Sequence, residues 1–94
     1  MYILGDIGNT ETKICIVSKK NKILKKITFL SKSVNINQLN SLFKKNKIQL
    51  KKIEKILFCS VVPGTFQIIK KFLSKKIKLK CLEVKNLNLK SLIK

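Results

Sequence analysis

The chain has 94 residues, a net charge of +18 and a hydrophobic content of 45%, which allows one small domain and excludes a disordered tail. No apolar run approaches the length of a membrane helix, and the N-terminus lacks the basic segment that precedes the apolar part of a signal peptide. We therefore expect a single cytoplasmic domain with no membrane segment.

The chain opens with two strands joined by a tight turn. Tyr2–Ile7 is an apolar run that ends on an acid and a glycine, which is typical of a buried strand. Residues 8–10 are turn residues, because glycine and asparagine tolerate positive φ. Residues 12–18 then predict a second strand, apolar on both faces between Ile14 and Val17.

A third strand is predicted over residues 22–30, after a turn at residues 19–21. Ile23, Ile27 and Phe29 are expected to share one face, which Lys25 interrupts. Lysines within a strand suit an edge position, where they discourage pairing with another chain. The first third of the chain therefore predicts a three-stranded meander.

Two helices alternate with two further strands in the rest of the chain. The first helix has Ser33 or Asn35 as a candidate N-cap and ends near Asn46. A buried strand over residues 56–62 stops at Pro63, which suits the first turn of the second helix. The apolar positions at helical spacing are Ile36, Leu39, Leu42 and Phe43, then Phe66, Ile69, Phe72 and Leu73.

The last predicted strand covers residues 78–84, with Leu79 and Cys81 on one face. Residues 85–94 follow it, with leucines at 87, 89 and 92 that have no clear partner. The order βββαβαβ predicts an α/β fold with a mixed five-stranded sheet. This pattern resembles a ribonuclease H-like subdomain, the half-unit of actin-like ATPases and kinases.

The three cysteines are expected to be core residues. Cys15, Cys59 and Cys81 each lie in an apolar stretch, far apart in the sequence. The chain has no histidine, and the spacing of its cysteines fits no zinc site.

The segment over residues 6–13 is the candidate site. It places an acid at the end of the first strand, followed directly by a turn through which backbone N–H groups can approach phosphate. Lys13 adds a positive charge, whereas Asp6 requires a cation such as Mg²⁺ between itself and a triphosphate. A plain hairpin with a capping acid explains these residues equally well. The candidate nucleotide-binding residues are Asp6, Ile7, Gly8, Asn9, Thr10, Glu11, Thr12 and Lys13.

A second motif favours the phosphate loop. The chain resembles the type III pantothenate kinases, which begin with an apolar strand running into Asp-Ile-Gly-Asn-Thr and later carry Ser-Val-Val-Pro before an amphipathic helix. The matching residues here are Asp6 to Thr10 and Ser60 to Pro63, and several members also have lysine at the position of Lys13. The resemblance extends over essentially the whole chain.

The resemblance implies ATP-dependent phosphorylation of pantothenate to 4'-phosphopantothenate, the first step of coenzyme A biosynthesis. It implies a cytoplasmic homodimer that uses Mg²⁺ and a monovalent cation, K⁺ or NH₄⁺. Asp6 would be the acid linked to Mg²⁺, through water, and residues 60–63 would pack the sheet. Residues 1–94 would then be an N-terminal ATP-binding subdomain of actin-like fold, incomplete relative to the family.

The family's general-base segment and second phosphate loop have no counterpart among these residues, so no catalytic residue is predicted. We expect the 94 residues alone to be inactive, with apolar sheet surface left exposed. Two alternatives stay open. One is a small lysine-rich nucleic-acid-binding protein, although all 22 basic residues are lysines and specific binding is disfavoured without arginine. The other is a relic that keeps the kinase fold without catalysis.

Overall fold

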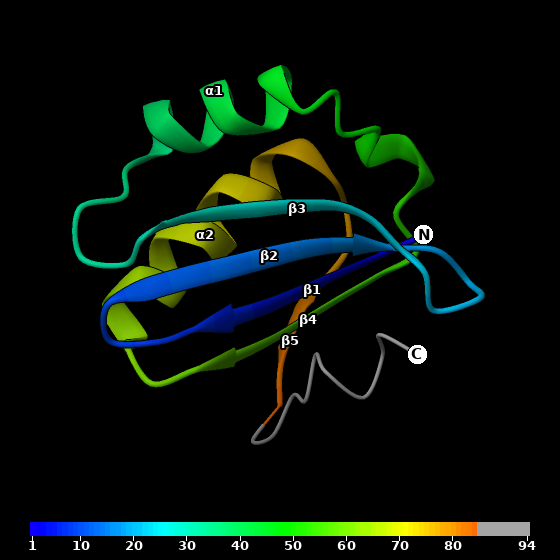
Figure 1. Cartoon of the computed structure of the whole chain (residues 1–94). Helices are drawn as coiled ribbons and strands as arrows, with labels where there is room; N and C mark the ends of the chain where they lie inside the picture. Colours follow the sequence, from blue (N-terminus) through cyan, green and yellow to red (C-terminus); the bar gives the residue numbers. More distant parts are fainter. Residues whose placement is uncertain (85–94) are drawn as a thin grey trace.

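The apolar run at the start of the chain becomes the middle strand of a five-stranded sheet. The computed structural model describes residues 1–84, in which strands and helices follow one another in the predicted order βββαβαβ (Figure 1). A short 3₁₀ turn, which the sequence did not predict, precedes the fourth strand. The elements are β1 (Tyr2–Ile7), β2 (Glu11–Val17), β3 (Ile23–Leu30), α1 (Ile36–Lys45), η1 (Leu50–Lys52), β4 (Lys55–Ser60), α2 (Pro63–Lys76) and β5 (Cys81–Glu83).

The strand order across the sheet is β3-β2-β1-β4-β5. The two hairpin connections make β1, β2 and β3 antiparallel, and the two crossovers make β4 parallel to β1 and β5 parallel to β4. This confirms the predicted mixed sheet of an α/β fold. The lysine-bearing strand β3 lies at the edge, also as predicted.

Both helices cover the same face of the sheet, and the main core lies beneath them (Figure 1). Ile14 and Ile16 of β2 belong to this core, whereas Cys15 and Val17 belong to a second, smaller cluster with Leu4. Side chains alternate between the two faces of a strand, so the second cluster lies on the face away from the helices. The prediction that β2 is apolar on both faces is therefore confirmed.

One predicted face in β3 is wrong. Ile27 and Phe29 belong to the helix-side core, but Ile23 packs against the cluster on the opposite face. The pairing of β2 with β3 shifts between Ile16, which faces Lys25, and Val17, which faces Ile23. A bulge of one extra residue reverses the alternation of side chains beyond it, and no periodic pattern in the sequence reports it.

The ends of α1 are fixed by asparagines. The Asn35 side chain accepts a hydrogen bond from the Gln38 backbone N–H at 2.8 Å, so Asn35, rather than Ser33, is the N-cap. Asn46 is the C-cap, as expected. The Lys25 ammonium donates to the Asn46 backbone carbonyl, which explains why a lysine lies on the helix-facing side of β3.

The last strand and the cysteines differ in part from expectation. β5 covers three residues rather than seven, because only Cys81–Glu83 pair with β4. Cys15 is buried as predicted, but Cys59 and Cys81 are half-buried. Leu79 and Cys81 both pack against the helix-side core, as expected. The three leucines predicted to lack a partner, at 87, 89 and 92, lie outside the described residues.

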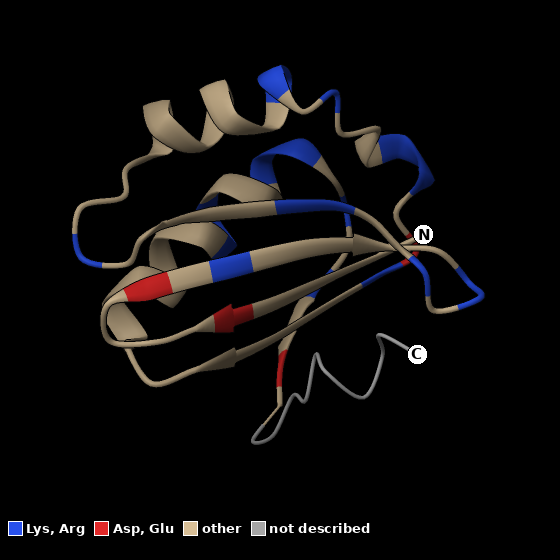
Figure 2. Cartoon of the chain, viewed as in Figure 1, with Lys and Arg blue, Asp and Glu red and all other residues tan. Residues whose placement is uncertain are grey.

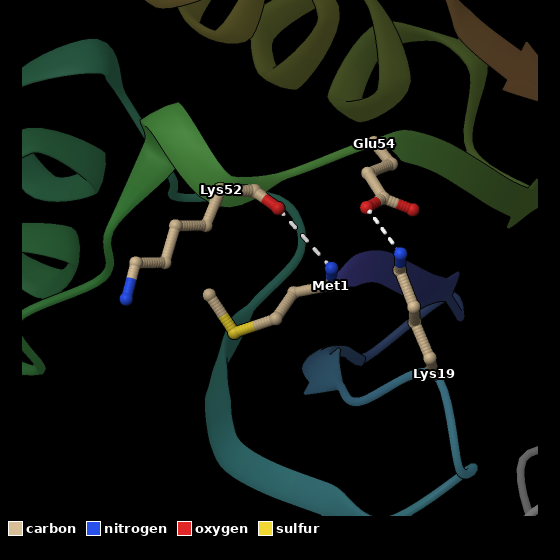
Figure 3. Close-up of polar contacts among 4 residues, drawn as sticks. All are labelled: Met1, Lys19, Lys52 and Glu54. Atoms are coloured by element: carbon tan, nitrogen blue, oxygen red, sulfur yellow. Dashed lines mark hydrogen bonds and ion pairs between the residues drawn. The ribbon is translucent and has the colours of Figure 1, made fainter.

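The sheet begins at the end of the molecule that Figure 3 shows. The Met1 ammonium donates to the Lys52 backbone carbonyl at 3.1 Å, and the Glu54 N–H donates to the Met1 carbonyl at 2.8 Å. Lys19 Nζ lies 3.1 Å from Glu54 Oε1, and this hydrogen bond raises the pKa of Lys19. Both side chains are exposed, so the ion pair contributes little stability.

No helix within residues 1–84 has the length and apolar character needed to cross a membrane.

The pairing of β1 with β4 depends on a missing side chain. Gly5 lies opposite Phe58, whose ring is fully buried. A Cβ atom at position 5 would lie 1.9 Å from Phe58 Cε1, a distance that real Cβ atoms do not show. Gly5 is therefore required for the Phe58 ring to fill the space above the central strand.

We predict that Gly5→Ala lowers the free energy of unfolding by about 3 kcal/mol or more, because the ring must leave its place or the strands must separate. Gly64→Ala is the matched control, since nothing lies within 4 Å of its added Cβ and φ is not positive there. The control is expected to stabilise the chain by about 0.5 kcal/mol, because alanine suits a helix better than glycine. Urea denaturation followed by circular dichroism measures both, and equal effects of the two substitutions would contradict the assignment.

Candidate functional site

The eight predicted nucleotide-binding residues lie at the far end of the β1–β2 hairpin. Asp6 and Lys13 are both exposed and stand directly opposite each other on the two antiparallel strands. Their side chains point away from the helices, since Ile7 and Ile14 point into the helix-side core. Directly opposite residues have Cβ atoms about 5 Å apart, so the structure places positions 6 and 13 side by side on the same face of the sheet.

The turn does not use the backbone conformation predicted for it. Neither Gly8 nor Asn9 has positive φ; within the described residues positive φ occurs at Asn21 and Lys47. The Gly8 N–H donates to the Glu11 carbonyl at 3.0 Å, so this N–H is not directed at solvent. A Cβ on Gly8 would lie 3.1 Å from the same carbonyl oxygen. Glycine is thus favoured here by the close approach of the two backbones, not by φ.

Three buried hydroxyls fasten the turn to the rest of the domain. Ser31 Oγ donates to the Gly8 carbonyl at 2.6 Å and lies 2.7 Å from Thr12 Oγ1. Thr65 Oγ1, in the first turn of α2, donates to the Ser31 carbonyl at 2.6 Å. We call Thr12, Ser31 and Thr65 the hydroxyl network. It joins the β1–β2 turn, the end of β3 and the start of α2 through side chains that are at most 4% exposed.

Sequence reasoning missed the roles of Ser31 and Thr65. Ser31 stood in a predicted loop, and Thr65 stood in the first turn of a predicted helix, where hydroxyls are common. Their burial depends on three elements that are distant in sequence, so neither position carried a local signal. The Ser31 N–H also donates to the Thr10 carbonyl at 3.0 Å, which adds a second bond from β3 to the turn.

The tip of the turn presents unused donors. Asn9 and Thr10 are exposed, and their N–H groups have no acceptor within residues 1–84. The two residues border a surface hollow of about 280 Å³ whose other lining residues are Leu30, Lys32 and Ser33. Backbone donors beside a lysine are the groups that bind phosphate oxygens.

The other predicted site residues are Ile7, Glu11 and Thr12, and they differ in whether their side chains are exposed. Ile7 and Thr12 have buried side chains, so only their backbones are near the site. Glu11 is exposed on the first position of β2 and carries a second negative charge near the turn. The Ile7 carbonyl accepts a hydrogen bond from the Val61 N–H at 3.0 Å, which ties the site to the end of β4.

The Ser60–Pro63 motif has an architectural role. Ser60 Oγ accepts from the Val62 N–H at 3.1 Å and donates to the Val62 carbonyl at 3.0 Å, forming the bend between β4 and α2. α2 then begins at Pro63, as predicted. Val61 is 63% exposed, so this valine does not pack the sheet as we expected of residues 60–63.

The site fits a metal only together with a ligand. Within the described residues no three His, Cys, Asp or Glu side chains gather to hold a metal ion. Mg²⁺ typically takes one or two protein carboxylates and completes its coordination with water and substrate phosphates, so the single exposed Asp6 suits Mg²⁺ carried by a nucleotide. Burial raises the pKa of the Cys15 and Cys81 thiols, which makes these two side chains poor nucleophiles.

Comparison with known proteins gives three results. The sequence profile of the family described as type III pantothenate kinase matches residues 2–94. A curated type III pantothenate kinase from Pelagibacter ubique (strain HTCC1062) is 51% identical over 94 residues, which are all of this chain and 38% of that protein. These two matches confirm the resemblance predicted from the motifs at residues 6–10 and 60–63.

A solved structure supports the fold. The crystal structure of a protein assigned as an N-acetylglucosamine kinase, from Porphyromonas gingivalis, superimposes with a TM-score of 0.55 at 17% identity. The similarity covers 88% of this chain and 34% of that one. This similarity confirms the predicted actin-like, ribonuclease H-like fold.

We predict that Ser31→Ala lowers the free energy of unfolding by about 1–3 kcal/mol, because the Gly8 carbonyl and the Thr12 hydroxyl lose their buried partner. Ser41→Ala on the exposed side of α1 removes the same atom at a site with no such partners and should change stability by less than about 0.5 kcal/mol. Amide hydrogen exchange provides a local readout, with faster exchange at Gly8 expected only in the Ser31 variant. Unchanged exchange at Gly8 would show that the network does not hold the turn.

Proposed function

The chain belongs to the type III pantothenate kinase family, and we propose that it supplies the first phosphate-binding segment of an ATP-dependent pantothenate kinase. In this reaction the γ-phosphoryl group of ATP is transferred to the primary hydroxyl of pantothenate: its bond to the bridging oxygen breaks, ADP leaves, the hydroxyl proton is released, and 4'-phosphopantothenate forms for coenzyme A biosynthesis. The chain spans 38% of the length of its curated relative. The activity is accordingly proposed for the protein as a whole, and residues 1–94 are proposed as its N-terminal actin-like subdomain.

The observation that carries the proposal is the exposed Asp6–Lys13 pair beside the unused N–H groups of Asn9 and Thr10. Lys13 attracts phosphate oxygens as a point charge. Asp6 repels them unless a cation stands between, so it selects a nucleotide that carries Mg²⁺. Bound Mg²⁺ would neutralise the charge that develops on the phosphates, and Asp6 would hold it through water.

The rigidity of the turn supports the same role. Phosphoryl transfer depends on positioning, and a loop that binds phosphate must keep its donors in place before the ligand arrives. The Ser31 hydroxyl of the hydroxyl network donates to the buried side of the turn, at the Gly8 carbonyl, while Asn9 and Thr10 remain exposed to solvent. The turn can therefore accept phosphate without rearranging its buried bonds.

No acid of the chain lies in a segment that matches the general-base segment of the family. The four acids are Asp6, Glu11, Glu54 and Glu83, and Glu54 is paired with Lys19 at the other end of the sheet. We therefore keep the prediction that the 94 residues alone do not phosphorylate pantothenate. A cytoplasmic location, a homodimer and a monovalent cation also stay predictions from the family.

We predict that Asp6→Asn weakens binding of Mg·ATP by about tenfold, because the metal loses its carboxylate. In EDTA the order should reverse, with the variant binding free ATP at least as tightly as the unsubstituted chain, since a negative charge beside the triphosphate has been removed. Isothermal titration calorimetry at about 0.15 M salt measures both conditions while limiting weak binding to surface lysines.

Glu54→Gln is the matched control, because it also removes one negative charge but lies at the opposite end of β1. It should leave both affinities unchanged. If the two variants behave alike in Mg²⁺ and in EDTA, ATP is bound by bare lysine charge rather than by the turn.

Growth of a bacterium depleted of its own pantothenate kinase tests the function itself. The natural gene containing this chain should restore growth, and Asp6→Asn should abolish the rescue at an equal protein level. Rescue by the Asp6→Asn gene would support the pantothenate kinase function but contradict the proposed role of Asp6. Failure of the unsubstituted gene to restore growth would contradict the pantothenate kinase function.

A further inference from the structure

A groove lies at the end of the molecule opposite the candidate nucleotide site. It runs between the last turns of α1 and α2 and has a volume of about 520 Å³. A second hollow of about 490 Å³ continues it along η1 and shares Ile48, Leu50 and Lys76 with it. We call the two together the basic groove; its lining residues are Asn40, Ser41, Phe43, Lys44, Ile48, Gln49, Leu50, Lys51, Lys52, Phe72 and Lys76.

The floor of the basic groove is apolar. Phe43 and Phe72 meet edge to face with ring centroids 5.1 Å apart, and each exposes only a small part of its surface. Ile48 and Leu50 are half-buried and flank the rings. A floor of this kind accepts one or two apolar side chains and gives little surface for stacking a nucleic-acid base.

The rim of the basic groove is formed by exposed lysines, Lys44, Lys51, Lys52 and Lys76. Within residues 1–84 the one ion pair joins Lys19 to Glu54, so none of the rim lysines is neutralised by an acid. Figure 2 shows basic segments gathered at this end, where α1 and α2 finish and η1 lies, while acidic segments of β1 and β2 lie near the other end. Lysines in the last turn of a helix favour its dipole, which accounts for two of the four but not for those of η1.

We propose that the basic groove binds an acidic segment of a partner protein, which places an apolar side chain on the floor between the two helices and its carboxylates on the lysine rim. The charge of the rim selects an acidic partner, and the apolar floor selects a peptide over a nucleic acid. The groove and the candidate nucleotide site lie at opposite ends of β1. Lys52 lines the groove, and its carbonyl accepts a hydrogen bond from the Met1 ammonium next to the start of the strand, whereas Asp6 lies near the end of the strand. β1 is about 17 Å long at 3.3 Å per residue, so the peptide and ATP would not compete for the same surface.

The test uses a fluorescein-labelled peptide in which four glutamates surround a Leu-Phe pair, with fluorescence anisotropy measured on the full chain at about 0.15 M salt. Replacing the Leu-Phe pair by two serines should weaken binding at least about fivefold, as should replacing the glutamates by glutamines. Lys44→Gln combined with Lys76→Gln should weaken binding of the original peptide by a similar factor. Leu50→Ser tests the floor and should do the same without changing the net charge.

The matched control is Lys70→Gln combined with Lys71→Gln, which removes the same charge from exposed positions of α2 outside the groove. This variant should bind the peptide within about twofold of the unsubstituted chain. Circular dichroism of each variant shows whether it is folded. If both double-lysine variants lose the same amount of peptide affinity, or if the serine peptide binds as tightly as the original peptide, the proposal is wrong and the peptide is held by unspecific attraction to lysine charge. Tighter binding of oligo(dT) than of the peptide, with loss in the Lys44 and Lys76 variant, would assign the groove to a nucleic acid instead.

Discussion

The contact between Gly5 and the Phe58 ring is the constraint on which the rest of the domain depends. It allows the parallel pairing of β1 with β4 and fills the helix-side core at its centre. Because β1 is thereby fixed between β2 and β4, its last residues have only one register. Asp6 must then face away from the helices while Ile7 closes the core.

The hydroxyl network fixes the β1–β2 turn to the sheet and to α2. A buried hydroxyl is costly unless it is bonded, and here each member has a partner within the domain. Ser31 is bonded to the turn, to β2 and to α2, so movement of any one of them breaks a buried bond. A surface turn of exposed polar residues therefore rests on a rigid polar base, which is the property that a phosphate-binding loop needs.

The two ends of the sheet differ in charge and in chemistry. One end carries the Asp6–Lys13 pair and the exposed turn, and the other carries the apolar groove with its lysine rim. A net charge of +18 by itself suggested only general attraction to anions. Its distribution over the fold separates the proposed phosphate site from the surface proposed to bind an acidic partner.

The sequence by itself determined the order of the elements, the mixed sheet and the two family motifs, because periodicity, turn residues and Pro63 are local signals. Only the tertiary structure decided the face of Ile23, the burial of Ser31 and Thr65, and the need for glycine at position 5. The face of Ile23 depends on a bulge in the pairing of β3 with its neighbour β2. The other two features depend on contacts between elements far apart in the chain, a bond between β3 and α2 and a ring from β4 against β1. Local patterns report which residues prefer burial, but not which partner meets them, and that partner is fixed when the sheet and helices pack together.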